Sequence, residues 1–387
     1  MHNGALGLAT QQNFQSGRAI ALTLTIGAGG TLVLGIQPLL LETLLSQGRV
    51  NASQLGWVAT AEVLGMAVGV LLGTRMLSGR KGRLIAAVAG LIMAVSNLAT
   101  LFASEPLLIV CIRALTGAAE GVLVAVAVLS ISFSIAPARL NAAFLTVGAA
   151  PQLLLAYLIP AVLVPRFGPN LGFELMVGVG LSCALMALCV RERFAPQALQ
   201  PLQRIVWTHT VVLALIATLV MAAAIGACWS YIGPLAAESG LNQEQTGIAV
   251  AASLICQLLG SLVVAIVGWR LPFRAALLGG AVLQASTVMW LLGAHQALEF
   301  SIALGIFGFL WQGGMPFAMD LIVAVDSSRA TAPFVLPLNL TGLSVGPLAA
   351  SYFVDHSVVG AFRVGIFGCF LAVLGYLLVF RSRPRFR

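Results

Sequence analysis

Long runs of the chain contain no charged residue, and these runs constrain the fold more than any other feature. Residues 19–41, 84–104, 140–165, 205–237, 247–269 and 275–298 lack Asp, Glu, Lys and Arg. An α-helix needs about 20 residues to cross a hydrocarbon core about 30 Å thick, so each run is long enough to span a membrane. Only 8% of the 387 residues are charged, too few to cover the surface of a water-soluble protein. The sequence therefore predicts an integral membrane protein.

The spans are predicted to be helices and not strands of a barrel. Barrel strands alternate apolar and polar residues over about ten positions, whereas both faces of these runs are apolar. Including segments that carry one or two charges, we expect an all-α protein with 12 transmembrane helices. Their predicted centres lie near residues 31, 65, 94, 120, 153, 181, 222, 258, 285, 312, 342 and 369.

The charged residues predict the orientation of these spans. With the N-terminus in the cytoplasm and alternating loops, most basic residues fall inside, among them Arg191 and Arg204, and most acids, such as Glu42 and Glu238, fall in outer loops. Inner loops of membrane proteins carry an excess of Lys and Arg. We therefore expect a multi-pass protein with both termini cytoplasmic. The net charge of +8 then reflects topology and contact with anionic lipid, and not binding of nucleic acid.

The chain repeats itself after 191 residues. This shift places residues 54–69 on residues 245–260 without a gap and matches Gln54 with Gln245, and it also matches Arg83 with Arg274. Repeats of this size are typical of secondary transporters. The sequence predicts an N-terminal six-helix half over residues 1–190, a cytoplasmic linker over 191–207 and a C-terminal six-helix half over 208–387.

Two motifs carry a family resemblance. In the segment SGRKGRL, Arg80, Gly82 and Arg83 match a basic loop between the second and third helices, although Gly79 stands where an acid is usual. Arg113 is followed at four-residue spacing by Gly117 and then Gly121. With twelve spans in two parallel halves, the chain resembles the major facilitator superfamily. The resemblance implies a secondary transporter that works by alternating access, in which the fourth helix lines a central cavity.

Charged residues inside the spans are the main candidates for mechanism, because each ionised group near the centre of a membrane helix costs about 2.5–3.5 kcal/mol. Glu62, Glu120, Asp320 and Arg113 qualify. Glu120 and Glu62 are predicted proton-coupling residues, since a carboxyl group in a span can take up and release a proton. Arg113, two helical turns before Glu120, is a predicted substrate contact. A structural network of ion pairs between helices is the alternative interpretation of these residues.

Polar and aromatic residues of the spans supply further candidates. The predicted substrate contacts besides Arg113 are Gln37, Trp229, Tyr231, Trp311 and Gln312. Trp311 is the repeat equivalent of Glu120, so the two halves are expected to offer an indole and a carboxyl group to a partly aromatic or amphipathic solute. The alternative for Trp229 and Tyr231 is that they anchor a helix at the membrane interface.

Charged residues near the inner surface are predicted to form a cytoplasmic gate. Asp320 lies near the inner end of the tenth span, and Asp326 and Arg329 follow it closely. This position favours a gate or an ion pair over a substrate site. The gate candidates are Arg80, Arg83, Arg139, Asp320, Asp326 and Arg329.

An enzyme is the competing class of function. Residues 342–346 fit Gly-x-Ser-x-Gly, but a nucleophile elbow requires a turn from strand to helix and a His base within reach, and this string lies in an apolar helix. An intramembrane serine hydrolase is therefore a remote alternative. We expect no enzyme activity and no cofactor. We also expect no metal site, because the six cysteines lack paired spacing.

The sequence thus predicts a secondary transporter of a small organic solute in the inner membrane of a bacterium. Proton-coupled efflux is the first hypothesis, because the fourth helix resembles that of drug exporters, and proton-coupled uptake of an organic anion is the alternative, favoured by Arg113. The expected partners are the solute, the proton and membrane lipid, and we expect the protein to be a monomer.

Overall fold

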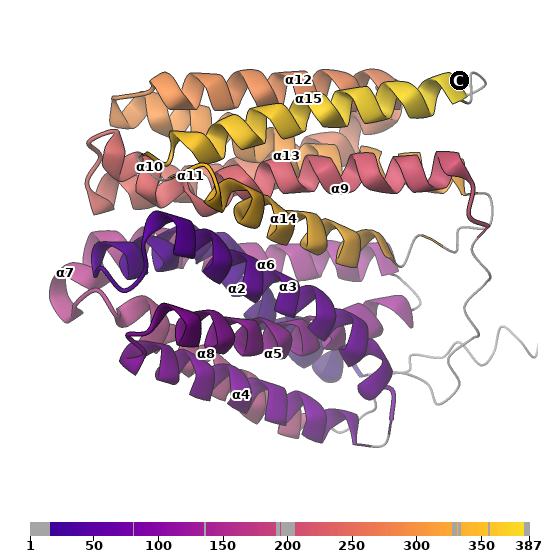
Figure 1. The fold of residues 1–387 in the computed structure, drawn as a ribbon. Coiled ribbons are helices and arrows are strands. Elements are labelled where there is room, and N and C mark those ends of the chain that lie inside the picture. The colour runs from indigo at the N-terminus through magenta and orange to yellow at the C-terminus, as the bar shows by residue number, and fades with distance from the viewer. Residues whose placement is uncertain are drawn as a thin grey trace, which may run out of the picture.

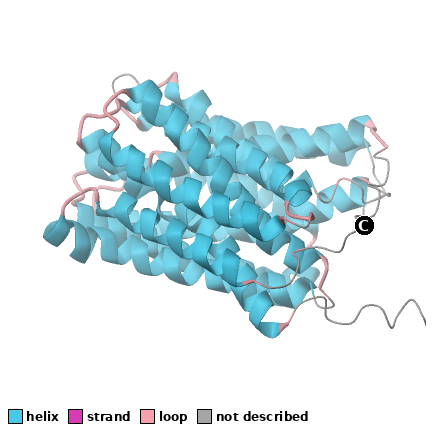
Figure 2. Cartoon of the chain, turned by 90° about the horizontal axis from the view of Figure 1, so that it is seen from below, coloured by secondary structure: helices cyan, strands magenta, loops and turns pink. Residues whose placement is uncertain are grey.

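Twelve apolar helical segments run roughly parallel through the molecule, which is described from a computed structural model covering residues 16–79, 81–134, 137–190, 194, 206–326, 331, 334–354 and 357–382. Every regular element in these ranges is a helix (Figures 1 and 2). The predicted all-α class is therefore confirmed. The predicted linker at 191–207 lies almost entirely outside the described residues.

The first six segments form the lower part of the view in Figure 1. They comprise α2 (Gly17–Ser46), α3 (Ala52–Met76), α4 (Gly82–Phe102), α5 (Pro106–Ser132), α6 (Pro137–Leu158) and α8 (Leu171–Cys189). Helix α6 continues through a π-helical turn, η1 (Ile159–Leu163), into α7 (Val164–Phe167). Because Pro160 lacks an amide hydrogen, the regular α-helical bonding changes to the wider turn at this point.

The last six segments form the upper part of the same view. They comprise α9 (His209–Ser230), α11 (Gln243–Val267), α12 (Phe273–Gly293), α13 (Ala297–Val325), α14 (Val335–Ser351) and α15 (Val359–Ser382). The short helix α10 (Ile232–Glu238) follows α9 directly, and η2 (Gly268–Arg270) follows α11.

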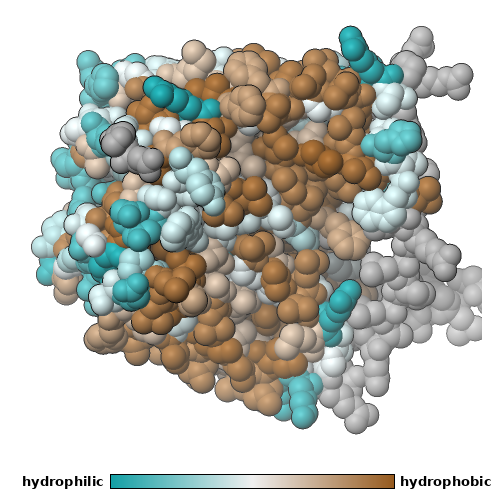
Figure 3. All heavy atoms as spheres, viewed as in Figure 1, coloured by the Kyte–Doolittle hydropathy of each residue, from teal (hydrophilic) through white to brown (hydrophobic). Residues whose placement is uncertain are grey.

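Among the described residues, eleven helices are long and apolar enough to cross a membrane, and α14 is a shorter apolar helix of 17 residues at the remaining predicted position. Hydrophobic side chains cover the middle of the face seen in Figure 3, while hydrophilic ones gather toward the ends of the helices. Large hydrophobic side chains such as Leu185 and Phe370 are more than half exposed, as expected of a surface that faces lipid.

The 191-residue repeat recurs in the local structure. Asn51 and Asn242 each begin a helix with a capping box, in which the side chain accepts the amide of Gln54 or Gln245 and the glutamine side chain bonds back. Such boxes satisfy two amides that a helix start otherwise leaves unpaired. The contacts between helices repeat as well, since Gly117 packs on the backbone of Glu62 and Gly308 packs on the backbone of Ser253.

Candidate functional site

The closest packing in the N-terminal helices is between α3 and α5, and it brings the predicted charged residues together. Gly65 and Gly69 of α3 face the backbone of α5 at Ala114 and Ala118, while Gly117 and Gly121 of α5 face the backbone of α3 at Glu62 and Met66. Small residues at four-residue spacing allow membrane helices to approach at backbone distance. The four-residue glycine pattern therefore positions Glu62 beside the helix that carries Arg113 and Glu120.

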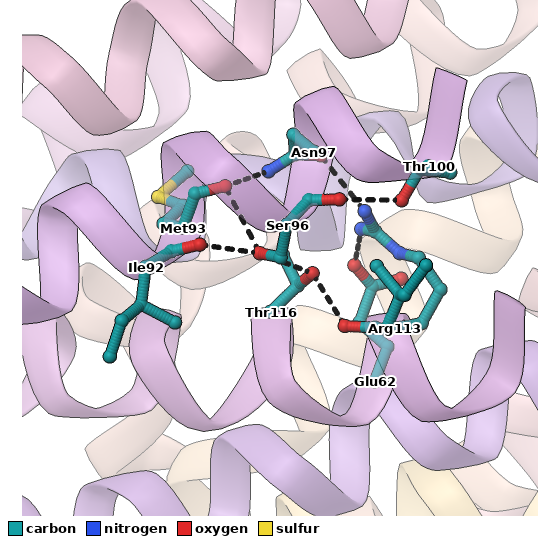
Figure 4. Close-up of polar contacts among 9 residues, drawn as sticks. Glu62, Ile92, Met93, Ser96, Asn97, Thr100, Arg113 and Thr116 are labelled. Carbon is teal, nitrogen blue, oxygen red and sulfur yellow. Dashed lines mark hydrogen bonds and ion pairs between the residues drawn. The ribbon is translucent and has the colours of Figure 1, made fainter. Parts of the chain in front are cut away.

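Arg113 and Glu62 form a buried ion pair across this contact (Figure 4). The side chain of Arg113 is 1% exposed and that of Glu62 is 2% exposed. A second nitrogen of Arg113 donates to Oδ1 of Asn97 on α4 at 2.8 Å, and the guanidinium lies 5.5 Å from the ring centroid of Phe173 on α8. All these partners belong to the N-terminal helices.

Hydroxyl and amide groups of α4 and α5 extend this network (Figure 4). Thr116 donates to Oγ of Ser96 at 2.8 Å, and the amide of Asn97 donates to the carbonyl of Met93 at 2.8 Å. Buried polar groups are stable when they find such partners. The structure thus engages Arg113 inside the N-terminal helices, where the sequence predicted a contact with substrate.

Glu120 lies two turns farther along α5 and differs from Glu62 in its surroundings. The residue is fully buried, and both carboxyl oxygens lack a hydrogen-bond partner in the described part of the chain. Gly30 of α2 packs on its backbone oxygen. A buried polar group without a partner is expensive, so Glu120 is the least satisfied charged residue that the sequence predicted for the site.

Gln37 is buried on α2 just before Pro38. Its exposed fraction is 3%, and its Nε2 has no hydrogen-bond partner among the described residues. Gln312, the other amide among the predicted contacts, is half-buried on α13.

The predicted aromatic residues cluster where the two groups of helices meet. The rings of Trp229 and Trp311 are 5.5 Å apart in an edge-on arrangement, and Phe307 lies 6.4 Å from Trp311. Trp229 donates from Nε1 to the carbonyl of Leu34 at 2.9 Å, which joins α9 to α2. Edge-on aromatic pairs of this kind add to packing.

Tyr231 makes a second contact between the two groups of helices. Its hydroxyl donates to the carbonyl of Ala52 at the start of α3, at 2.9 Å, and the residue is fully buried. Neither Tyr231 nor Trp229, which is 3% exposed, lies on the lipid-facing surface. Both residues therefore hold the two groups of helices together, near the end of the bundle that carries α7 and α10, which we call the distal end (Figure 1).

The predicted cytoplasmic gate is not assembled in the part of the chain that the structure describes. Arg83, Arg139 and Asp320 are exposed, and no ion pair joins them. Asp326 is buried and accepts hydrogen bonds from the amide and hydroxyl of Thr331, at 2.9 and 2.7 Å. Arg80 and Arg329 lie outside the described residues.

A pocket opens inside the C-terminal helices, beside Trp311. It is partly open and is lined mainly by apolar groups, with Thr218, Asn339 and Tyr376 as polar members. Ligand pockets commonly combine apolar walls with a few polar groups. The other lining residues are Met221, Ala222, Ile225, Ala276, Leu277, Gly280, Ala281, Leu310, Gly314, Met315 and Ala318.

A difference between the repeats explains this pocket. In the N-terminal helices, Gly27 and Gly30 bring α2 against α5 at Ala127 and Leu123. The equivalent residues on α9, 191 positions later, are Thr218 and Met221, and α9 packs much less closely on α13. Side chains thus replace glycines and hold the C-terminal pair apart.

Sequence reasoning missed this pocket and also the position of Glu42. Glu42 was interpreted as an acid of an outer loop, but it lies within α2, where its Oε2 is buried without a hydrogen-bond partner in the described residues. The repeat carried the missing signal, because Gly233 is the equivalent of Glu42 and packs against it.

Three solved structures with this arrangement of helices are of transporters. Nucleoside transporter NupG superposes with a TM-score of 0.75 at 10% identity, over 96% of this chain and 100% of that one. A bacterial homologue of the human lysosomal transporter Spinster, in an inward-facing and unoccupied conformation, superposes with a TM-score of 0.71 at 13% identity, over 97% of this chain and 99% of that one. The D-xylose-proton symporter superposes with a TM-score of 0.70 at 16% identity, over 94% of this chain and 96% of that one.

This chain has the major facilitator superfamily fold. The resemblance predicted from the two motifs is confirmed for the fold, and none of these three neighbours is an enzyme. No protein-family model and no curated protein matches the sequence. Within the described residues, no group of three or more His, Cys, Asp or Glu side chains could hold a metal ion.

Proposed function

We propose that the protein is a proton-coupled secondary transporter of a small organic solute with an apolar ring, and that Glu120 carries the proton. The observation that carries the proposal is the contrast between the two acids near α5. Glu62 is paired with Arg113, whereas Glu120 is buried with two unpartnered carboxyl oxygens among the described residues. Carboxyl groups inside membrane spans commonly form part of proton relays in transporters.

The pocket beside Trp311 supports the choice of solute. Its walls are largely apolar, and Trp311 offers an aromatic face next to polar groups of Asn339 and Thr218. A neutral or weakly polar solute with a flat ring would match these surfaces. Trp311 is half-buried and packs against Trp229. A solute in the pocket would therefore touch a residue that packs on the contact between the two halves.

Efflux in exchange for protons remains the first direction of transport, as the sequence predicts. Uptake of an organic anion loses support, because Arg113 is already engaged by Glu62 and Asn97. Symport with a proton is a second candidate, and the likeness to the D-xylose-proton symporter favours it. We place the protein in the bacterial inner membrane as a monomer with the distal end outside, following the distribution of basic residues.

A transport assay in proteoliposomes tests the proposal. A screen for thermal stabilisation of the purified protein first identifies a solute, since a ligand that binds the folded state raises the unfolding temperature. Addition of that solute to vesicles containing a trapped pH indicator should then drive proton movement: antiport moves protons against the direction of the solute, and symport moves them with it. Solute flux without any proton movement would contradict proton coupling.

A further inference from the structure

The contact between the two halves at the distal end half-buries a carboxyl group that the proposed transport cycle does not use. Glu42 lies one turn before the end of α2 and lines a pocket with Pro160 of η1, Gly233 of α10 and Thr246 of α11. Its Oε2 is buried and has no hydrogen-bond partner among the described residues. The pocket thus joins elements of both halves around one unpaired carboxyl oxygen.

The distal contact is tight because it is made partly through backbone. A methyl group built on Gly233 would lie 2.7 Å from the carbonyl oxygen of Pro38, 2.9 Å from Cβ of Glu42 and 3.4 Å from its Oε2. Gly247 of α11 packs on Pro160 in the same way. Position 233 is the repeat equivalent of position 42. The side chain of Glu42 therefore occupies the space that a side chain at position 233 would need.

The charged groups of the neighbouring elements do not reach this pocket. Glu238 at the end of α10 accepts from the hydroxyl of Ser357 and the amide of Val358, and Arg49 donates to the carbonyl of Ala103. Arg166 of α7, Glu174 of α8 and Glu244 of α11 lie on the packed elements, and none of them lines the pocket. Among the described lining residues, Glu42 is the one titratable group.

We propose that Glu42 is a proton-binding group of the distal gate, so that its protonation favours the closed distal contact and its ionisation favours opening. An ionised carboxylate with one oxygen buried and unpartnered is costly and needs water or a cation at that oxygen, whereas the neutral acid fits the closed contact. Closing therefore takes up a proton, and by linkage a lower pH on the distal side stabilises the closed form. The inference rests on the proposed transporter, whose distal end opens to water.

Hydrogen–deuterium exchange of the protein in nanodiscs tests this gate. Exchange of amides in residues 231–247 is measured between about pH 5.5 and 8.5 and corrected for the intrinsic effect of pH. In the unmodified protein, protection should fall as the pH rises, by up to about tenfold per pH unit for one linked proton. Glu42→Gln and Glu42→Leu should keep high protection at every pH.

Two matched variants separate this gate from other effects. Glu244→Gln removes an exposed acid at the same end and should keep the pH dependence of the unmodified protein. Glu174→Gln removes an exposed acid of α8 at that end and should keep it too. Proton-coupled transport is measured separately with Glu120→Gln, so failure of the proposed function and failure of the gate are distinguishable. The proposal is overturned if protection does not depend on pH in the unmodified protein, if Glu42→Gln retains that dependence, or if both neutral variants at Glu42 fail to fold.

Discussion

The two halves of the molecule use the same glycine contacts but fill the space around them with opposite chemistry. Gly117 on Glu62 in the first half corresponds to Gly308 on Ser253 in the second. Arg113 corresponds to Leu304 and Glu120 to Trp311. The C-terminal helices thus form the same close contact without any of these charges, which indicates that the charges of the N-terminal half are not required to build the fold.

The two halves also differ in the groups that they offer to the proton and to the solute. The N-terminal half holds an ion pair, its hydrogen-bond network and the unpartnered carboxyl group of Glu120. The C-terminal half holds the aromatic pair of Trp229 and Trp311 and the pocket beside it. In our account the first half handles the proton and the second half handles the solute, and Trp229 links them through its hydrogen bond to Leu34.

The largest effect is expected from breaking the ion pair on one side. Arg113→Leu leaves Glu62 buried without its partner and should destabilise the protein by about 3–5 kcal/mol. The double variant Glu62→Ser with Arg113→Leu introduces the residues of the C-terminal half and should recover most of that loss, because apolar replacements of a buried pair are often neutral. Unfolding in detergent, followed by helix content, measures both variants.

That pair of variants can break the comparison between the halves. If the double variant is as unstable as Arg113→Leu alone, the charges are needed for folding and the two halves are not interchangeable in this respect. Asn97 stays in place in both variants, so its lost bond to Arg113 affects them equally.

A smaller effect, on solute binding, is expected from filling the C-terminal pocket. Gly280 lines the pocket and Gly279 does not, and a methyl group built on either meets no atom within 4 Å. Gly280→Leu should weaken binding of the identified solute at least about tenfold, or about 1.4 kcal/mol, while Gly279→Leu should leave it unchanged. Both variants should fold as the unmodified protein does.

The Kd of the solute, measured by its effect on thermal stability, distinguishes these outcomes. Equal weakening by Gly279→Leu and Gly280→Leu would mean that the effect comes from distortion of α12. Unchanged binding in Gly280→Leu would place the solute outside this pocket and remove the assigned role of the second half.

Composition and repeats in the sequence were sufficient to predict the fold. The absence of charge identifies the spans. Asn51 and Asn242 recur at the repeat distance, and both begin a helix with a capping box. The direction of a side chain was harder to predict than the fold. Two residues can lie on the same face of α5, but their spacing does not show which neighbouring helix each long side chain contacts. Arg113 turns to Glu62 and Asn97, and this depends on how closely α3 and α4 approach.

The pocket and Glu42 escaped prediction for a related reason. Both depend on contacts between repeats, where Thr218 replaces Gly27 and Gly233 faces Glu42. Such differences are visible in the aligned repeats, but their consequence is set by three-dimensional packing. Asp320 and Asp326 show the same limit: close in sequence, they are exposed and buried respectively.

Glu120 carries the proton in the proposed cycle, and transport by Glu120→Gln tests this role most directly. In sealed proteoliposomes, the variant should still exchange labelled for unlabelled solute, because the pocket beside Trp311 is intact. An imposed pH gradient should no longer drive net accumulation, and solute should no longer move protons. A Glu120→Gln protein that accumulates solute and moves protons as well as the unmodified protein would contradict the account.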